Sequence, residues 1–225
     1  QEIVWIKSGF FLFIFVSIIG YLYPCLLVSS FTKIKKMTFT AIDFETAHAS
    51  FPCEIGLTVV ENGQITESRS WLIKPACFPY MNPWNERVHG ISSAELVDAP
   101  DFGTLWSEIH QYFDDRMLVA HNAAFDMSVL RAALAYYDLA IPYSEYFCSV
   151  SLSRRIWKEL PGHSLGTVAQ HLGFHFNHHR AGDDAEVCAR IALKALENNA
   201  QEEATLNEIL KSLNVKIHNL RKAGK

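Results

Sequence analysis

Asp43-Phe44-Glu45-Thr46 is the stretch on which the fold and the function of this chain depend. It follows the run Thr38-Phe39-Thr40-Ala41-Ile42, whose β-branched and aromatic residues favour a β-strand. Because side chains alternate along a strand, Asp43 and Glu45 should point to the same face. Two neighbouring carboxylates repel each other, and no Lys or Arg is close in the sequence. A divalent cation held by their oxygens would relieve this repulsion, whereas a solvated strand edge with two ordinary acids is the simpler alternative.

The composition fits one ordinary domain with a hydrophobic core. The chain has 225 residues, a hydrophobic content of 49% and a formal net charge of −4. No general excess of basic residues indicates nucleic-acid binding, so any such binding depends on local patches or on bound cations. The five cysteines are scattered and show no CxxC spacing, which argues against a disulfide framework and a zinc site and fits a reducing compartment.

The first 36 residues differ in composition from the rest of the chain. No charged residue occurs from position 8 to position 32, a length that could span a bilayer as a helix. Lys33, Lys35 and Lys36 follow, and their charge would keep the C-terminal side of an inner-membrane anchor in the cytoplasm. A signal peptide is another alternative. We favour a cytoplasmic protein whose working part begins at Met37, so that residues 1–36 are not part of it.

The residues after Met37 predict a three-stranded antiparallel meander. The strands are expected at 38–42, 53–61 and 64–73, with Asn62-Gly63 as the turn between the last two. Pro75, Pro79 and Pro83 predict an irregular connection. A short helix should follow at Ser92, because Ser92 and Glu95 have capping-box spacing.

Strands and helices alternate in the second half, which predicts an α/β mixed sheet flanked by helices. We expect a buried strand at 117–120 and a weaker, last strand at 146–148, with helices in the segments 101–113, 126–138, 152–157, 164–172, 183–196 and 201–213. The basic end of the chain should be frayed. The predicted division is residues 1–36 as a hydrophobic segment, 37–198 as the functional domain, and 199–225 as a charged helix with a basic tail.

Two further acids are expected to point into the domain. Asp126 lies on the apolar stripe of its helix with Val129 and Leu130, although a simple helix cap is the alternative. Asp184 lines up with the apolar stripe of the next long helix, whereas Asp183 lies on the polar side. We therefore expect Asp184 to be buried and Asp183 to cap the helix.

Three motifs now stand in order along the chain. They are Asp43-x-Glu45, His121-Asn122-x-x-Phe125-Asp126 and His179-x-Ala181-x-x-Asp184-Ala185. Together they resemble the motifs of the DEDD superfamily of 3′–5′ exonucleases, in the histidine subtype that includes the proofreading epsilon subunit of bacterial DNA polymerase III. The resemblance covers roughly residues 37–197 and implies a ribonuclease H-like fold, with three antiparallel strands followed by parallel strands.

The resemblance also implies roles for individual residues. Asp43, Glu45, Asp126 and Asp184 would hold two Mg²⁺ or Mn²⁺ ions, and His179 would be the general base. Phe44, Thr46 and Ile91 match positions that contact the terminal nucleotide in similar enzymes. His178 and Asp183 have the same spacing as His179 and Asp184; we choose the second pair because Ala181 and Ala185 then fall where the family has alanine.

The expected function is metal-dependent hydrolysis of DNA from its 3′ end, releasing nucleoside 5′-monophosphates in replication proofreading or repair. The expected partners are single-stranded DNA or a frayed 3′ end, and a DNA polymerase. RNA is an alternative substrate, and a non-catalytic module that binds nucleic acid or a polymerase is an alternative class. Membrane contact is expected only if residues 8–32 form a genuine anchor.

Overall fold

The computed structural model describes residues 37–197 and 204–222. The hydrophobic segment at 8–32 lies outside the described residues. The described part forms a six-stranded mixed sheet in the order β3-β2-β1-β4-β5-β6. The predicted fold class, a ribonuclease H-like mixed sheet flanked by helices, is confirmed.

The antiparallel half of the sheet is the predicted meander. β1 (Phe39–His48) pairs with β2 (Phe51–Glu61), which pairs with β3 (Gln64–Leu72). Asn62 and Gly63 make the turn between β2 and β3 with φ values of 52° and 77°, in the left-handed region that Asn and Gly tolerate. β1 is longer than expected because it continues through Asp43-Phe44-Glu45-Thr46 instead of ending before it.

The parallel half of the sheet places the second motif beside β1. β4 (Met117–Ala120) is parallel to β1, and β5 (Glu145–Cys148) is parallel to β4. The carboxyl ends of these parallel strands lie at one edge of the sheet, where sites form in folds of this class. The expectation that β5 is the last strand is wrong, because β6 (His218–Asn219) pairs antiparallel with it.

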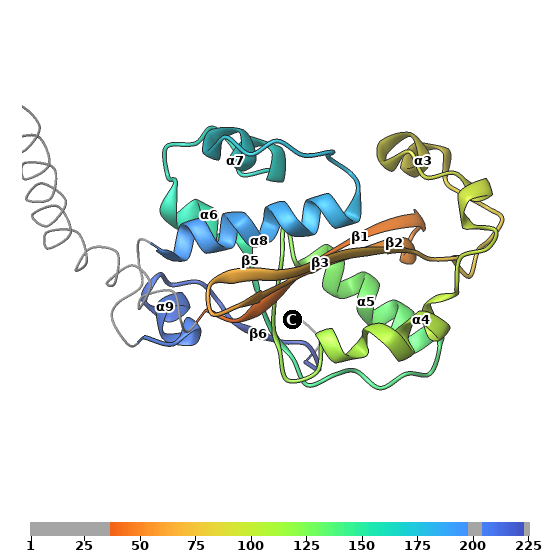
Figure 1. The fold of residues 1–225 in the computed structure, drawn as a ribbon, viewed down its shortest axis with the longest axis horizontal. Helices are drawn as coiled ribbons and strands as arrows, with labels where there is room; N and C mark the ends of the chain where they lie inside the picture. Colours follow the sequence, from red (N-terminus) through yellow and green to blue (C-terminus); the bar gives the residue numbers. More distant parts are fainter. Residues whose placement is uncertain (1–36, 198–203, 223–225) are drawn as a thin grey trace, which may run out of the picture.

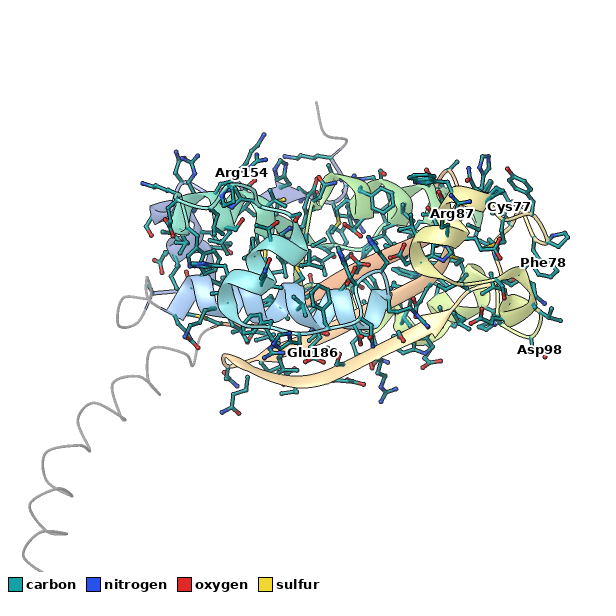
Figure 2. The ribbon with its side chains drawn as sticks, turned by 90° about the horizontal axis from the view of Figure 1, so that it is seen from above. Cys77, Phe78, Arg87, Asp98, Arg154 and Glu186 are labelled. Carbon is teal, nitrogen blue, oxygen red and sulfur yellow. The ribbon has the colours of Figure 1, made fainter. Side chains whose placement is uncertain are left out.

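Helices cover both faces of the sheet (Figure 1). On one face lie α6 (Ser149–Ile156), α7 (Leu165–Leu172) and α8 (Ala181–Glu197), whereas α4 (Phe102–Ile109) and α5 (Ala124–Tyr136) lie on the other. Seen from above, α8 extends along the sheet and α3 (Pro83–His89) lies toward one end of the molecule (Figure 2). The short helices η1 (Ser93–Leu96) and η2 (His110–Tyr112) follow α3 and α4.

Each face of the sheet has its own hydrophobic core, and β1 contributes to both. Phe39 and Ala41 pack with α8, whereas Ile42 and Phe44 pack with the residues of α4 and α5. This alternation puts the odd-numbered residues of β1 on the α8 face. Asp43 and Glu45 therefore belong to the α8 face.

Gly56 allows the start of α8 to lie directly on β2. A Cβ atom at Gly56 would be 1.8 Å from the carbonyl oxygen of Ala181, a separation that two non-bonded atoms cannot adopt. The absence of a side chain is therefore required for this close approach. The contact sets the height of the first turn of α8, which carries Asp184, above the sheet.

The structure differs from the predictions in two further segments. Helix α3 was missed: Asn82 caps it by accepting a hydrogen bond from the Trp84 amide, and Pro83 occupies its first turn, where proline is tolerated. The basic end is not frayed over its described part, because Leu220 is buried. Helix α9 (Leu206–Ser212) also packs its apolar side chains into the core on the α8 face.

Within residues 37–197 and 204–222, the helices are too short or too polar to cross a membrane.

Candidate active site

Three of the predicted acids meet on the α8 face of β1. Carboxylate oxygens of Asp43, Glu45 and Asp184 all lie within 4.8 Å of one another. Asp43 and Glu45 come from one strand and share a face, as the alternation of side chains predicts. Asp184 is only 4% exposed and comes from the first turn of α8.

Asp126 is the fourth acid, and it reaches β1 from the opposite face. It lies in the first turn of α5 and is 1% exposed. Its Oδ1 accepts a hydrogen bond from the Phe44 amide at 3.1 Å, so the carboxylate points at the strand that carries Asp43 and Glu45. The alternative that Asp126 caps its helix does not hold, because the N-cap position is occupied by Ala123.

Asp183 and Asp184 have different environments, as expected, but Asp183 does not cap the helix. α8 begins two residues earlier, at Ala181, and Asp183 Oδ2 instead accepts a hydrogen bond from the Asn177 amide at 3.1 Å. Asp184 Oδ2 accepts from the His179 amide at 3.2 Å. The structure therefore brings Asp184, and not Asp183, to Asp43 and Glu45.

All four acids have raised pKa values, and burial is the largest cause in each. Burial, together with repulsion from Asp184 and other carboxylates, raises the pKa of Glu45 to about 8. Burial also raises the pKa values of Asp126 and Asp184 to about 7 each. The pKa of Asp43 lies well above its usual range because of burial and the charge of Asp126. Without positive charge among them, the four groups resist ionisation at neutral pH.

The donor set fits divalent cations. Asp184 Oδ1 is buried and has no hydrogen-bond partner among the described residues. A buried carboxylate oxygen without a partner is costly unless a ligand occupies it. Carboxylate oxygens are the ligands that Mg²⁺ and Mn²⁺ prefer, and a bound cation would offset the repulsion that raises the pKa values.

We expect the metal-free protein to become less stable as the pH rises from 7 to 8. Glu45, Asp126 and Asp184 have raised pKa values in the folded state and ordinary values near 4 when unfolded, so the folded chain holds more protons in this range. Thermal unfolding in a chelator should show a falling Tm, by roughly 2–4 °C for each kcal/mol lost.

Asp184→Asn supplies the control for this pH effect, because it removes one of the titrating acids while keeping its shape. It should raise the Tm of the metal-free protein at pH 8 and flatten the dependence on pH. An unchanged slope in the variant would contradict the electrostatic interpretation. Below pH 7 the buried histidines act in the opposite direction, since burial lowers the pKa values of His89 and His121.

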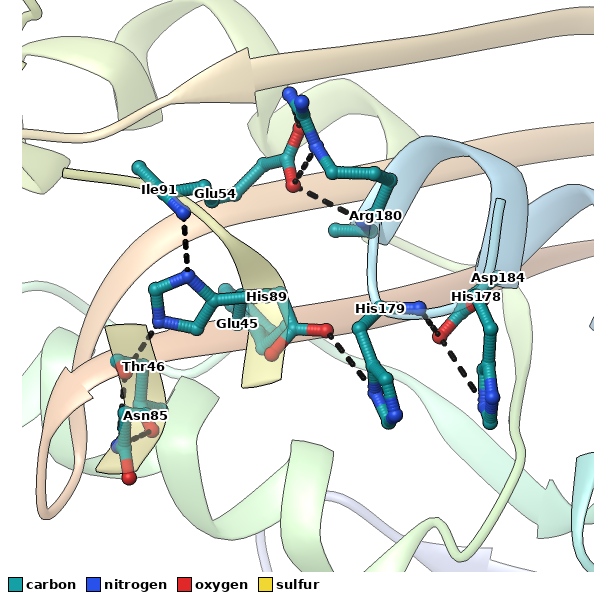
Figure 3. Close-up of polar contacts among 12 residues, drawn as sticks. Glu45, Thr46, Glu54, Asn85, His89, Ile91, His178, His179, Arg180 and Asp184 are labelled. Atoms are coloured by element: carbon teal, nitrogen blue, oxygen red, sulfur yellow. Dashed lines mark hydrogen bonds and ion pairs between the residues drawn. The ribbon is translucent and has the colours of Figure 1, made fainter. Parts of the chain in front are cut away.

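His179 and His178 form a stacked pair beside the acids (Figure 3). Their ring centroids are 3.9 Å apart with an interplanar angle of 16°. His179 Nδ1 lies 3.9 Å from Glu45 Oε1, and His178 Nε2 lies 4.0 Å from Asp184 Oδ2. His179, the predicted general base, is thus at the site, and its neighbour is equally close to the acids.

The three predicted substrate-binding residues have different positions. Phe44 is 2% exposed and lines the cavity around the acids, and Thr46 lines a neighbouring cavity of about 390 Å³. The Ile91 side chain is fully buried in a separate small core and lines neither cavity. The structure therefore brings Phe44 and Thr46 to the site but does not place the Ile91 side chain there.

The sequence of this chain matches the model of a known protein family. A family model described as an exonuclease, RNase_T, matches residues 40–192. The chain belongs to this exonuclease family. The resemblance to a family of exonucleases is thereby confirmed.

Two curated relatives illustrate the sequence similarity to this exonuclease family. The 3′-5′ exonuclease DinG of Bacillus subtilis (strain 168) is 32% identical over 174 residues, which are 75% of this chain and 18% of DinG. The DNA polymerase III subunit epsilon of Aquifex aeolicus (strain VF5) is 29% identical over 165 residues, 71% of this chain and 81% of that subunit. The chain spans only 18% of DinG, and only 12% of another relative, the DNA polymerase III PolC-type of Thermotoga maritima, to which it is 32% identical over 168 residues.

A solved structure shows the same exonuclease fold. Exonuclease X, in complex with 5′ overhanging duplex DNA, superposes with a TM-score of 0.61 at 24% sequence identity. The match covers 78% of this chain and 99% of Exonuclease X. The family as a whole implies a dependence on divalent metal ions, which agrees with the cluster of acids.

Sequence reasoning missed an ion pair that fixes the third motif of the exonuclease domain. Glu54 lies opposite Glu45 in the β1–β2 register, and it is 1% exposed. It accepts hydrogen bonds from Arg180 Nε at 3.3 Å, Arg180 Nη2 at 3.1 Å and the Ala181 amide at 3.0 Å (Figure 3). This bidentate pair ties the loop that carries His179 to β2.

A second hydrogen-bond network that sequence reasoning missed surrounds His121, the first residue of the second motif of the exonuclease domain. His121 Nε2 is 2.9 Å from the His163 carbonyl, which can only accept, so Nε2 carries the proton. Burial lowers the pKa of His121 to about 4, so the ring is neutral and Nδ1 accepts from Ser149 Oγ at 2.8 Å. His121 thereby joins the end of β4 to the start of α6 and to the loop before α7.

Helix α3 is held at the other side of the exonuclease site by polar contacts to Thr46. The Ile91 amide donates to His89 Nδ1 at 3.0 Å, so His89 Nε2 carries the proton and donates to the Thr46 carbonyl at 3.3 Å. Asn85 Nδ2 donates to the Thr46 carbonyl and hydroxyl at 2.9 and 3.1 Å. These contacts set the position of Trp84, which is 69% exposed at the cavity that contains Thr46.

Proposed function

We propose that this chain is a 3′–5′ exonuclease that hydrolyses DNA and releases nucleoside 5′-monophosphates. The observation that carries the proposal is the convergence of Asp43, Glu45 and Asp184 within 4.8 Å, with Asp126 buried against the same strand. A module that only binds nucleic acid does not need four clustered acids, two of them buried, whose ionisation is unfavourable. Membership of the exonuclease family supports the same conclusion.

Asp43, Glu45, Asp126 and Asp184 would hold two Mg²⁺ or Mn²⁺ ions. Bound cations supply positive charge at the scissile phosphate and lower the pKa of an attacking water. The unpartnered Asp184 Oδ1 and the raised pKa values support this assignment, because a cation would use that oxygen and relieve the repulsion.

His179 would accept the proton of the attacking water at a ring nitrogen. Its side chain is 42% exposed, so it can pass the proton on to solvent. Glu45 Oε1 lies 3.9 Å from Nδ1, which places the ring beside the acids. The Glu54–Arg180 pair holds the backbone next to His179, which keeps the base in place.

Exposed aromatic side chains beside the acids would receive the terminal bases. Trp84 and Phe125 are 69% and 42% exposed, and both line the cavity that contains Glu45 and Thr46. Aromatic faces stack on unpaired bases whatever their sequence, which suits an enzyme that removes any terminal nucleotide. Thr46 and the backbone of Phe44 would complete the contacts on the β1 side, whereas Ile91 would act by supporting them from the core.

The biological setting follows the names of the relatives. Several are DNA polymerase III proteins, which favours DNA as the substrate and a DNA polymerase as the partner. We propose a role in proofreading or repair in the cytoplasm, acting on single-stranded DNA or a frayed 3′ end. Among the solved structures, one is named for recognition of a histone mRNA stem-loop, so RNA is kept as the competing substrate in the test.

The test is a digestion of 5′-labelled single-stranded DNA and of an RNA of the same sequence. With Mg²⁺ the DNA should shorten from its 3′ end in single-nucleotide steps, and a chelator should stop the reaction. The released product should carry a 5′-phosphate. Faster digestion of the RNA would reverse the substrate assignment, and a chain that binds either strand without shortening it would show the non-catalytic alternative to be right.

A further inference from the structure

The stacked pair His178 and His179 has no role as a pair in the proposed chemistry, since one base is sufficient. His179 has a φ of 69°, in the left-handed region that a non-glycine residue seldom adopts. In an extended segment two consecutive side chains point to opposite sides, whereas this backbone conformation places both rings on the same side, 3.9 Å apart. Such strain is found where a particular arrangement of side chains is needed.

The two imidazoles and Asp184 have the composition of a transition-metal site. One ligand atom from each of His178, His179 and Asp184 lies within 4.8 Å of the others. Two histidines with one carboxylate is a ligand set that Zn²⁺ accepts in proteins, with a remaining position for water. Mg²⁺ prefers oxygen ligands and does not compete for imidazole nitrogen.

The surroundings leave the two rings available to a metal. The side chains of His178 and His179 are 43% and 42% exposed, so the rings can turn their nitrogens toward a common point. The ring of Phe176 lies 5.3 Å from that of His178 and supports it from the outer side.

We propose that His178, His179 and Asp184 form a Zn²⁺ site whose occupation inhibits the exonuclease. The inhibitory part rests on the proposed function, because Zn²⁺ would take Asp184 from the catalytic cations and His179 from its role as base. Zinc and magnesium would then exclude each other through their shared ligand. The scattered cysteines do not make a zinc motif, and here histidines supply the nitrogen ligands instead.

The test compares the parent chain with His178→Gln and with His175→Gln. His175 is an exposed histidine on the same loop that does not belong to the ligand set, so it is the matched control. Zinc affinity is measured on the metal-free full chain by competition with a chromophoric chelator, without nucleic acid. Inhibition is measured as the Zn²⁺ concentration that halves DNA digestion at two fixed Mg²⁺ concentrations.

His178→Gln should weaken zinc affinity and raise the half-inhibiting concentration by at least about tenfold, the least expected for disturbing a metal site. His175→Gln should match the parent in both measurements, and higher Mg²⁺ should protect the parent. Equal zinc affinity in His178→Gln and the parent would overturn the site, as would equal weakening by both substitutions. If the chain does not digest DNA at all, the proposed function fails while the affinity measurement still decides the zinc site.

Discussion

Asp184→Asn is expected to slow DNA digestion by about 10²–10³-fold or more, as found when a group that stabilises a transition state is removed. Asn keeps the shape of Asp, and its oxygen can still accept the hydrogen bond that Asp184 Oδ2 receives from the His179 amide. The substitution removes the negative charge and with it a ligand for the cations. Initial rates at saturating Mg²⁺ give the size of the loss.

Asp183→Asn is the matched control, because it makes the same chemical change one residue away. Asp183 is only partly buried and accepts from the Asn177 amide, which an Asn side chain can also do. Most of the activity should therefore remain. Equal losses in the two variants would mean that the register of the third motif is wrong.

His179→Ala is expected to slow turnover by about 10²–10⁴-fold, the range of general acid–base catalysis. The four acids do not depend on this side chain, so Mn²⁺ binding measured by calorimetry should remain close to that of the parent.

His175→Gln serves again as the control, since it changes a histidine of the same loop that lies away from the acids. Its rate should match that of the parent. An unchanged rate in His179→Ala would remove His179 as the base. A parallel loss of Mn²⁺ binding would instead give His179 a part in holding the cations.

The sequence predicted the acids well because each prediction needed only local periodicity. Alternation along a strand puts Asp43 and Glu45 on one face, and the 3.6-residue repeat turns Asp184 inward and Asp183 away. The structure confirms both placements. The order of the motifs then brought distant acids together through the fold that the resemblance implied.

The missed features depend on contacts between distant residues or on segments with little periodicity. Glu54 looks like an ordinary strand residue until Arg180, 126 positions away, is seen beside it. The prolines before α3 were interpreted as breakers, although Asn82-Pro83 is a common way to begin a helix. β6 has two residues, which is too short for any pattern.

The contact between Gly56 and Ala181 limits which substitutions this protein tolerates at residue 56. Replacing glycines is an ordinary way to make a chain more heat-resistant, because it reduces the freedom of the unfolded state. At this position any replacement would lift the start of α8, so that Asp184 and the preceding loop with His179 would move away from β1. A thermostabilised version must therefore keep Gly56 and place its stabilising substitutions on the surface.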